Sequence, residues 1–431
     1  MSETQTVFCV LCLLLAPLTW AGLAVMNTGL GRARNAAHSM LAALCVIAVA
    51  ACIWFVCGQA FFGSPGATAY FFTIGGKTWD WIGAGSWFFR GLPISTSGKP
   101  MPPAFLFAWF GIVAAGLAGL IPLGSSSDRW RIGAICASTA LLSGLTFPLF
   151  AHWSWGGGWL AQLGANFGLG RGYIDAGGSG AIHVVGGLTA LAVTWIAGSR
   201  RGKYTPEGMP MAIPAHNAVL VLLGCMLAFV GWLGLNAAGA MLFFGVESGR
   251  VPLIAVNTLL GASSAALVAA VITRLRYGKP DASLTANGWV GGLVAGSAAC
   301  AFVPSAAILI VGLVTGALVT FSVEILDLKL EVDDPGGSIS VHAIGGLWGV
   351  LAAGIFGRLE AGGGGQFWAQ VVGLATLLGL VLPLTYGLNL SLNLILPQRV
   401  GVEGEHQGMD LHELGAGAYP EFITHTDDFM R

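Results

Sequence analysis

Long apolar stretches, separated by short segments that carry the charged residues, dominate the pattern along this chain. A helix needs about 20 apolar residues to cross the roughly 30 Å hydrocarbon core of a bilayer. The pattern therefore predicts an all-α integral membrane protein with eleven membrane-spanning helices. We expect these helices near residues 7–28, 39–63, 103–123, 132–155, 179–198, 214–242, 252–273, 284–303, 305–326, 338–357 and 366–397.

The apolar pattern alone leaves two points about the predicted spans open. Residues 282–323 contain no charged residue and are too long for one helix, so we divide them at Pro304, where a tight hairpin is favoured. The first stretch follows the acidic Glu3 and has no basic residue before it. It lacks the charge pattern of a cleaved secretory signal, and we interpret it as a retained span.

The composition agrees with a chain whose main solvent is lipid. The 431 residues are 55% hydrophobic and only 9% charged, with a mean hydropathy of +0.78. Soluble domains carry roughly 25% charged residues. The net charge is −1 and no basic patch is present, so nucleic acid is not an expected partner. We predict a multi-pass protein of the cell (inner or plasma) membrane.

The distribution of Lys and Arg predicts the orientation, because loops on the cytosolic side carry an excess of basic residues. With the N-terminus outside and the C-terminus inside, 13 basic residues lie on the inner side and six on the outer side. The inner set is Arg32, Arg34, Arg129, Arg131, Arg200, Arg201, Lys203, Arg274, Arg276, Lys279, Lys329, Arg399 and Arg431, and the outer set is Lys77, Arg90, Lys99, Arg171, Arg250 and Arg358.

One phrase occurs twice in nearly the same form. DAGGSGAIHVVGG runs from Asp175 with a histidine at His183, and DPGGSISVHAIGG runs from Asp334 with a histidine at His342. Five predicted spans separate the copies, so they enter the membrane from opposite sides. This predicts inverted five-plus-five repeats, about 1–200 and 211–357, followed by the last helix at 366–397 and a cytosolic tail at 399–431. Transport proteins built this way have their site near the bilayer midplane.

Each repeated histidine lies in a stripe of small residues. Ser179, His183 and Gly187 are four residues apart, on one face of an α-helix, and the second copy repeats this spacing around His342. Small residues allow two helices to approach closely. Each histidine lies about 12 Å along a helix from its aspartate, which predicts that both imidazoles lie near the midplane.

Four interpretations of the histidine pair are open. The first is a relic of duplication, the second a pair of haem ligands, the third a metal-ion site, and the fourth part of a conduit for a small, weakly polar substrate. The glycine-rich stripes favour close packing over a haem, and no carboxylate lies at the same depth for a metal. Ionisable groups inside spans are usually functional, which favours the conduit. We expect no cofactor, no metal and no enzymatic activity.

The outer end of the fourth predicted span is rich in tryptophan. In the stretch HWSWGGG, Trp155 directly precedes three glycines. Tryptophan near a membrane surface is commonly an anchor in the interfacial belt. Next to glycines, its ring face is also free to bind a cation. The residues themselves leave both interpretations open.

Several motifs together resemble the ammonium transporter family. They are WSWGGG, the repeated D-x-G-G-x-x-x-x-H, GWLGLNAAGA, VDDPGGSISVHAIGGLWG and, in the tail, GMDLHELGAGAYPEF. The resemblance covers essentially the whole chain. It implies an eleven-span subunit, a homotrimer with one conduction path in each subunit, and a PII signalling protein as a possible partner at the inner mouth.

The resemblance also implies roles for individual residues. Trp155 would recruit ammonium on the outer side, and Asp175 would support that site. His183 and His342 would line the pore as twin histidines. The ammonium would lose its proton near Asp175 and Phe107, and ammonia would then pass an apolar bore, with or without the proton. The alternative is an ammonium sensor whose signal leaves through the tail.

The chain departs from the family pattern at several positions. Of the two phenylalanines that the family stacks outside the histidines, Phe107 would supply one, while Leu235 stands at the other position. Gly239 stands where a serine is usual, and Asn27 where an aromatic residue is usual. The acidic-basic pair usual at the end of the third span is missing in the stretch AGLAGLIPLGSSSDRW, residues 115–130. Leu235 predicts a looser outer gate that still excludes water.

Overall fold

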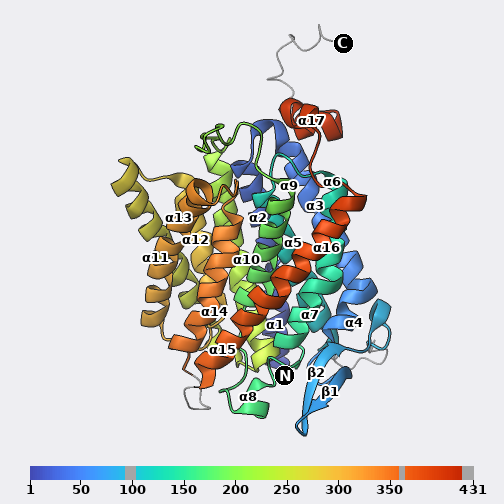
Figure 1. Ribbon diagram of the computed structural model, residues 1–431. Coiled ribbons are helices and arrows are strands. Elements are labelled where there is room, and N and C mark those ends of the chain that lie inside the picture. The colour runs from blue at the N-terminus through green and yellow to red at the C-terminus, as the bar shows by residue number, and fades with distance from the viewer. Residues whose placement is uncertain (93–102, 359–364, 420–431) are drawn as a thin grey trace.

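The structure is a computed structural model that describes residues 1–92, 103–358 and 365–419, and most of it is a bundle of helices running from one end of the molecule to the other (Figure 1). The first half contains α1 (Glu3–Leu15), α2 (Leu18–Leu30), α3 (Ala36–Ile53), α4 (Gln59–Phe62), α5 (Ala104–Ser125), α6 (Ile132–Leu141), α7 (Phe147–Ser154), α8 (Leu163–Phe167) and α9 (Val185–Ala197). The second half contains α10 (Ala218–Phe244), α11 (Val251–Tyr277), α12 (Ala282–Ser297), α13 (Ser305–Lys329), α14 (Gly345–Phe356), α15 (Gly365–Thr376), α16 (Leu382–Ile395) and α17 (Val402–Gln407).

The all-α membrane fold predicted from the apolar pattern is confirmed. Ten helical segments in the described residues are long and apolar enough to cross a membrane, and each coincides with a predicted span. The predicted span 284–303 corresponds to α12, which has only 16 residues before the chain continues in turns toward Pro304. The N-terminus and α17 lie at opposite ends of the bundle (Figure 1), as an odd number of crossings requires.

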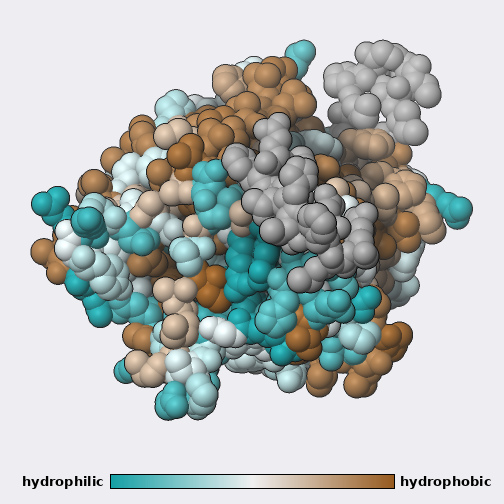
Figure 2. Space-filling view, turned by 90° about the horizontal axis from the view of Figure 1, so that it is seen from above, coloured by the Kyte–Doolittle hydropathy of each residue, from teal (hydrophilic) through white to brown (hydrophobic). Residues whose placement is uncertain are grey.

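The outward faces of the helices are apolar, as lipid contact requires. Large side chains on α10, α11 and α16 are more than half exposed, among them Val219, Met226, Leu267, Leu275, Leu394 and Ile395. At the end that carries α17, hydrophilic residues gather over the middle and toward the left and lower edges of the view, and hydrophobic residues lie mainly along the upper and right edges (Figure 2). The predicted inner loops meet at this end. Residues 420–431 of the predicted tail and Lys99 of the outer loops are outside the described residues.

A β-hairpin in a predicted outer loop is an addition to the all-α prediction. Strands β1 (Ala69–Ile74) and β2 (Lys77–Gly83) pair antiparallel. The turn between them is Gly75–Gly76, and both residues have positive φ, +59° and +75°. Glycine adopts this conformation without strain, and the flanking aromatic residues favour strands. The hairpin projects beyond the helix ends opposite α17 (Figure 1).

The two repeated phrases pack against each other through matched glycines. A Cβ atom on Gly187 would lie 2.4 Å from the backbone nitrogen of Ala343, and one on Gly346 would lie 2.7 Å from a side-chain atom of Val184. Val184 and Ala343 each directly follow the repeated histidine. No larger residue fits at either glycine without moving the partner segment. The two halves therefore meet closely beside the histidines.

Both histidines lie in π-helical turns, which corrects the predicted α-helical spacing. His183 belongs to the turn Ser179–Val184 that precedes α9, and His342 to the turn Ile339–Ile344 that precedes α14. The His183 amide donates to the carbonyl of Gly178, five residues earlier, at 3.0 Å. Such wider turns are rare and occur frequently at functional sites. Ser179, His183 and Gly187 are therefore not spaced as on a regular α-helix.

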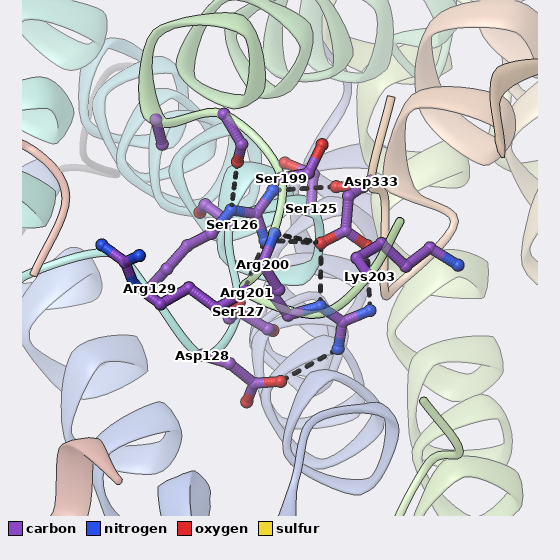
Figure 3. A network of polar contacts seen from close by, with 12 residues as sticks. Ser125, Ser126, Ser127, Asp128, Arg129, Ser199, Arg200, Arg201, Lys203 and Asp333 are labelled. Carbon is purple, nitrogen blue, oxygen red and sulfur yellow. Dashed lines mark hydrogen bonds and ion pairs between the residues drawn. The ribbon is translucent and has the colours of Figure 1, made fainter. Parts of the chain in front are cut away.

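A buried ionic cluster joins the two halves at the inner end (Figure 3). The Arg200 guanidinium donates to both Asp333 carboxylate oxygens at 2.9 Å, and it also donates to Asp128 at 3.0 Å. Arg129 lies 3.6 Å from Asp333 and donates to its carbonyl oxygen at 2.8 Å. Arg200 follows the helix that carries His183, and Asp333 directly precedes the second repeated phrase. The cluster therefore fixes one histidine segment relative to the other.

The same cluster corrects one sequence-based statement. An acidic and a basic residue are present at the end of the third span, but they stand just beyond its last helical residue, Ser125. Asp128 has a positive φ of 72°, so the chain turns sharply there and directs both Asp128 and Arg129 into the protein. The stretch therefore does contain an acidic and a basic residue side by side, and only the burial of the two side chains depends on a turn that the sequence does not reveal.

Asp333→Asn should destabilise the protein strongly, because it leaves Arg129 and Arg200 without a compensating buried charge. Burial acts to raise the pKa of Asp333, but Arg200 and Arg129 outweigh it and hold that pKa at about 2, below the ordinary 3.8. Its stabilising effect is therefore present above about pH 4 and is lost as the pH falls toward 2. At pH 7 we expect a loss of about 3–5 kcal/mol in the free energy of unfolding in detergent.

The matched control is Asp327→Asn, whose carboxylate pairs with Lys203 at a more exposed position. That change should lower the free energy of unfolding by about 1 kcal/mol or less. Equal losses for the two variants, or a loss for Asp333→Asn that does not shrink below pH 4, would contradict the structural importance of the cluster.

Candidate functional site

The two repeated histidines meet inside the bundle. The Nδ1 atoms of His183 and His342 are 3.2 Å apart, and their ring centroids are 5.2 Å apart with the planes inclined by 29°. His183 is fully buried and His342 is 4% exposed. The direct contact between the two nitrogens leaves no space for a haem iron between them. It suits two neutral imidazoles, one donating through Nδ1 and the other accepting.

The far nitrogen of His183 is free for another molecule. Its Nε2 is buried and has no hydrogen-bond partner among the described residues. In a neutral pair that shares one hydrogen between the Nδ1 atoms, one Nε2 is a donor and the other an acceptor. A buried polar atom without a partner is uncommon and calls for an explanation, such as a passing polar molecule. The pair therefore offers both kinds of hydrogen bond to a small substrate.

Trp232 holds the ring of His183 in place, and sequence reasoning missed it. The two rings are stacked with centroids 5.0 Å apart and planes 10° from parallel. The indole Nε1 donates to the Ser297 hydroxyl at 3.0 Å, which fixes the indole in turn. Trp232 lies in the middle of α10, within an apolar stretch that looks like any buried helix. Only the fold brings it against the histidine.

The two repeated aspartates form the same kind of hydrogen bonds to the backbone that follows them. The Asp175 carboxylate accepts from the backbone nitrogens of Gly180 and Ala181 at 3.0 and 2.7 Å. Asp334 accepts from those of Ser338 and Ile339 at 3.0 and 2.8 Å. Each aspartate therefore caps the first turn of its histidine segment, where unpaired amides favour a negative charge.

Burial also raises the pKa of both carboxyl groups, Asp175 and Asp334, above the usual value for aspartate. It raises the pKa of Asp175 to about 7 and that of Asp334 to about 6, although the backbone amides that donate to each group act in the opposite direction. The Oδ1 atom of Asp175 has no hydrogen-bond partner among the described residues. A carboxyl group of this kind can exchange a proton near neutral pH.

Trp155 is enclosed by aromatic rings next to Asp175. Its Nε1 donates to the Asp175 carbonyl oxygen at 2.6 Å, so the sequence-predicted tryptophan and aspartate are brought together. Phe243 stacks on the indole, and Phe110 meets it edge-on with centroids 5.4 Å apart. A hollow of about 250 Å³ opens beside these rings, lined in part by Trp155, Phe243 and Tyr173.

A second hollow lies on the inner side of the histidines. It has a volume of about 160 Å³, and its lining includes Arg200, Lys203, Asp333 and Asp334. Trp155 of the outer hollow bonds to Asp175, the first residue of one repeated phrase, and Asp334, the first residue of the other, lines the inner hollow. Among the described residues, no group of three or more His, Cys, Asp or Glu side chains is placed to hold a metal ion.

Comparison with known proteins agrees with this arrangement. Residues 7–419 match the Ammonium Transporter Family, which is almost the whole chain. The chain belongs to the ammonium transporter family. Members of this family are membrane transporters and not enzymes, and with its many spans this member is a multi-pass protein of the plasma membrane.

Relatives and solved structures cover nearly the full length. Ammonium transporter Amt2 of Archaeoglobus fulgidus is 33% identical, over 97% of this chain and 88% of that protein. The ammonium transporter of Bacillus subtilis is 31% identical, over 98% of this chain and 100% of its own length. A solved structure called Sensor Amt Protein is 26% identical with a TM-score of 0.84, covering 95% of this chain and 98% of that one. The fold of Candida albicans Mep2 is also similar, with 22% identity and a TM-score of 0.79, covering 98% of this chain and 91% of that one.

Two phenylalanines of α5, Phe107 and Phe110, pack against Phe243 beside Trp155. Phe107 is half-buried, and its ring contacts Phe243 at a centroid distance of 5.6 Å. The α5 ring that packs against Trp155 is Phe110, one helical turn further along. Phe110 is completely buried. The motif FLFAWF contains three phenylalanines at similar spacing, so sequence reasoning could not choose between them.

The departures on α10 and α2 are all buried. Leu235 is completely buried and lies three residues after Trp232. Because it is a leucine, it does not provide an aromatic ring on the outer side of the histidines. Gly239 packs so closely that a Cβ there would lie 2.1 Å from the carbonyl oxygen of Ala176. The Asn27 side chain donates to the Leu120 carbonyl at 3.2 Å and so links two helices. Gly239 and Asn27 therefore have packing roles of their own.

Restoring the usual serine at Gly239 should harm this protein. The new Cβ would collide with the backbone at Ala176, which directly follows Asp175, so the helix or the loop must shift. We expect Gly239→Ser to lower the free energy of unfolding by about 1–3 kcal/mol, the usual range for overpacking. It should not tighten ammonium binding. Melting temperature and ammonium affinity of the purified protein measure both effects.

Gly249→Ser is the matched control, because no atom lies within 4 Å of a Cβ built there. It should leave stability and affinity unchanged. A Gly239→Ser variant that is as stable as the unmodified protein and binds ammonium more tightly would refute the packing role of this glycine.

Proposed function

We propose that this family member transports ammonium through a path that passes the His183–His342 pair. The observation that carries the proposal is the direct contact of the two imidazoles between an outer aromatic hollow and an inner charged one. Ammonium enters at Trp155, gives up a proton near Asp175, and continues as ammonia past the two histidines. The proton is restored on the inner side, with or without having followed the same path.

The physical reason for deprotonation is the energy of a bare cation in the membrane. A charged group at the bilayer centre costs about 2.5–3.5 kcal/mol or more. Ammonia has no charge, and the imidazoles can exchange hydrogen bonds with it. Potassium has no proton to lose, so an apolar path with neutral polar groups discriminates by chemistry as well as size. Leu235 contributes apolar bulk that excludes water from this path.

Ammonium sensing is the second candidate function. It is favoured by the similarity to the structure called Sensor Amt Protein. A sensor would bind ammonium at the same outer site but pass little of it. Ammonium flux into vesicles that contain the purified protein separates the two functions, because a transporter gives saturable flux and a sensor gives binding with little flux.

The tail supports a regulatory connection. The Asp410 carboxylate accepts from the backbone nitrogens of His38 and Ala37 at 2.7 and 3.2 Å, which caps the first turn of α3. The buried Glu405 accepts from the Arg201 backbone nitrogen at 2.6 Å and from the Arg399 guanidinium at 2.8 Å. The tail is thus bound to the start of α3 and to the loop whose Arg200 and Lys203 line the inner hollow. We propose that it transmits the state of the path to a partner, a PII signalling protein, and that three subunits form a homotrimer.

His183→Ala and His342→Ala should each abolish ammonium flux or lower its selectivity over potassium. The expected change is about tenfold or more, equivalent to about 1.4 kcal/mol, because the substrate loses its polar partners in the path. The matched control is His406→Ala on the exposed face of α17. Flux of both ions into vesicles is the measurement. Unchanged selectivity in both pore variants would refute the proposed path.

Asp410→Ala should lower flux because it removes the cap that holds the tail on α3. A cap is worth about 1 kcal/mol, so we expect a decrease of about fivefold and weaker co-purification of an added PII protein. Glu403→Ala, at an exposed position on α17, is the control and should change neither. If truncation after Val400 also leaves flux and PII binding unaltered, the tail has no regulatory role.

A further inference from the structure

Phe243 covers the ring face that a cation would need at Trp155. The two rings are stacked with centroids 4.9 Å apart and planes only 3° from parallel. A cation that binds an aromatic face must lie over that face within about 6 Å of the ring centre. Phe110 approaches the same indole edge-on, and Trp155 is only 4% exposed. The stacked arrangement therefore leaves no room for a cation on that face.

The ring of Phe243 lies on the same face of α10 as Leu235 and Gly239, the two residues of this helix that depart from the family pattern. Leu235, Gly239 and Phe243 are four residues apart, so they follow one face of the helix. Leu235 lacks the aromatic ring, and Gly239 lacks a side chain altogether. Phe243 supplies a ring two turns, or about 12 Å, further out. The aromatic closure on α10 thus lies at the outer hollow and not directly above the histidines.

Phe243 is also placed where a ring can move. It is half-buried in the last turn of α10, which ends at Phe244, and Gly245 follows with a φ of +63°. Its ring borders the outer hollow of about 250 Å³, which is large enough to receive a phenyl group. Phe107 and Phe110 contact the ring from the α5 side, at 5.6 and 5.0 Å between centroids.

We infer that Phe243 is the outer gate of this protein. Its ring must leave the indole of Trp155 before an ammonium cation can bind there, and this requirement lowers the affinity and selects against larger cations such as methylammonium. The inference rests on the proposed function, because it assumes that Trp155 recruits ammonium. Leu235 then contributes apolar bulk to the path, and closure depends on Phe243.

The test is ammonium and methylammonium binding to the purified full-length protein, measured by calorimetry, together with flux into vesicles. Phe243→Ala uncovers the indole face, and we expect its dissociation constant for ammonium to fall roughly two- to tenfold, with a larger gain for methylammonium. Phe243→Leu removes the flat ring but keeps apolar bulk at the helix end. It should show a smaller gain in the same direction, and it decides the question if the alanine variant does not fold.

Two comparisons exclude a merely structural effect. Phe229→Ala makes the same change on the same helix, where the ring packs against Trp289, and it should leave both dissociation constants unchanged. In a Trp155→Leu background, Phe243→Ala should bring no gain, because there is no indole face to uncover. A gain that persists in that background, or a Phe243→Ala variant that binds like Phe229→Ala, overturns the inference.

Failure of the proposed function gives a different result. If the unmodified protein binds ammonium but passes none into vesicles, transport is refuted while the binding comparison still decides the role of Phe243. If Trp155→Leu binds ammonium as tightly as the unmodified protein, Trp155 is not the recruitment site and the gate inference is overturned with it.

Discussion

The close contact between the two halves of the chain is the constraint on which the other features depend. Gly187 lies against the backbone of Ala343, and Gly346 lies against Val184, so a side chain at either glycine would push the halves apart. The distance between the imidazoles of His183 and His342 is a direct consequence of this packing. In a membrane, helices associate through such close packing because lipid provides no hydrophobic driving force between them.

Buried charged residues beyond the helix ends reinforce this contact. Arg200 binds Asp333 through two hydrogen bonds and so ties the end of the first histidine helix to the start of the second repeated phrase. Removing one partner of such a buried pair lowers the stability of the protein by more than the pair itself contributes, because the remaining charge stays buried and unpaired. The aspartates of the two phrases, Asp175 and Asp334, complete the arrangement by capping the wide turns in which the histidines lie.

The outer end is built from aromatic rings that pack around Trp155. The histidine pair and the capped turns follow the repeated motif closely, whereas Leu235 and Gly239 on α10 depart from the pattern that the resemblance implies. Gly239 allows the helix to approach Ala176, and Phe243 lies flat on Trp155 further out. In the proposed mechanism, the entrance is therefore controlled by packing of rings that the family motifs do not include.

The sequence by itself determined the all-α membrane fold and the position of the ten long apolar spans, because apolar length is a local feature. Basic loops and a repeated phrase are local features too, and from them the sequence predicted the orientation, the inverted repeat and the residue types of the site. It did not determine the β-hairpin, the π-helical turns around His183, or the sharp turn at Asp128. Nor could it show that Phe110 packs against Trp155, or find Trp232 and Phe243, since many apolar residues share their spacing. Only the tertiary structure decided these, because which face of a uniformly apolar helix meets the site depends on residues far away in the chain.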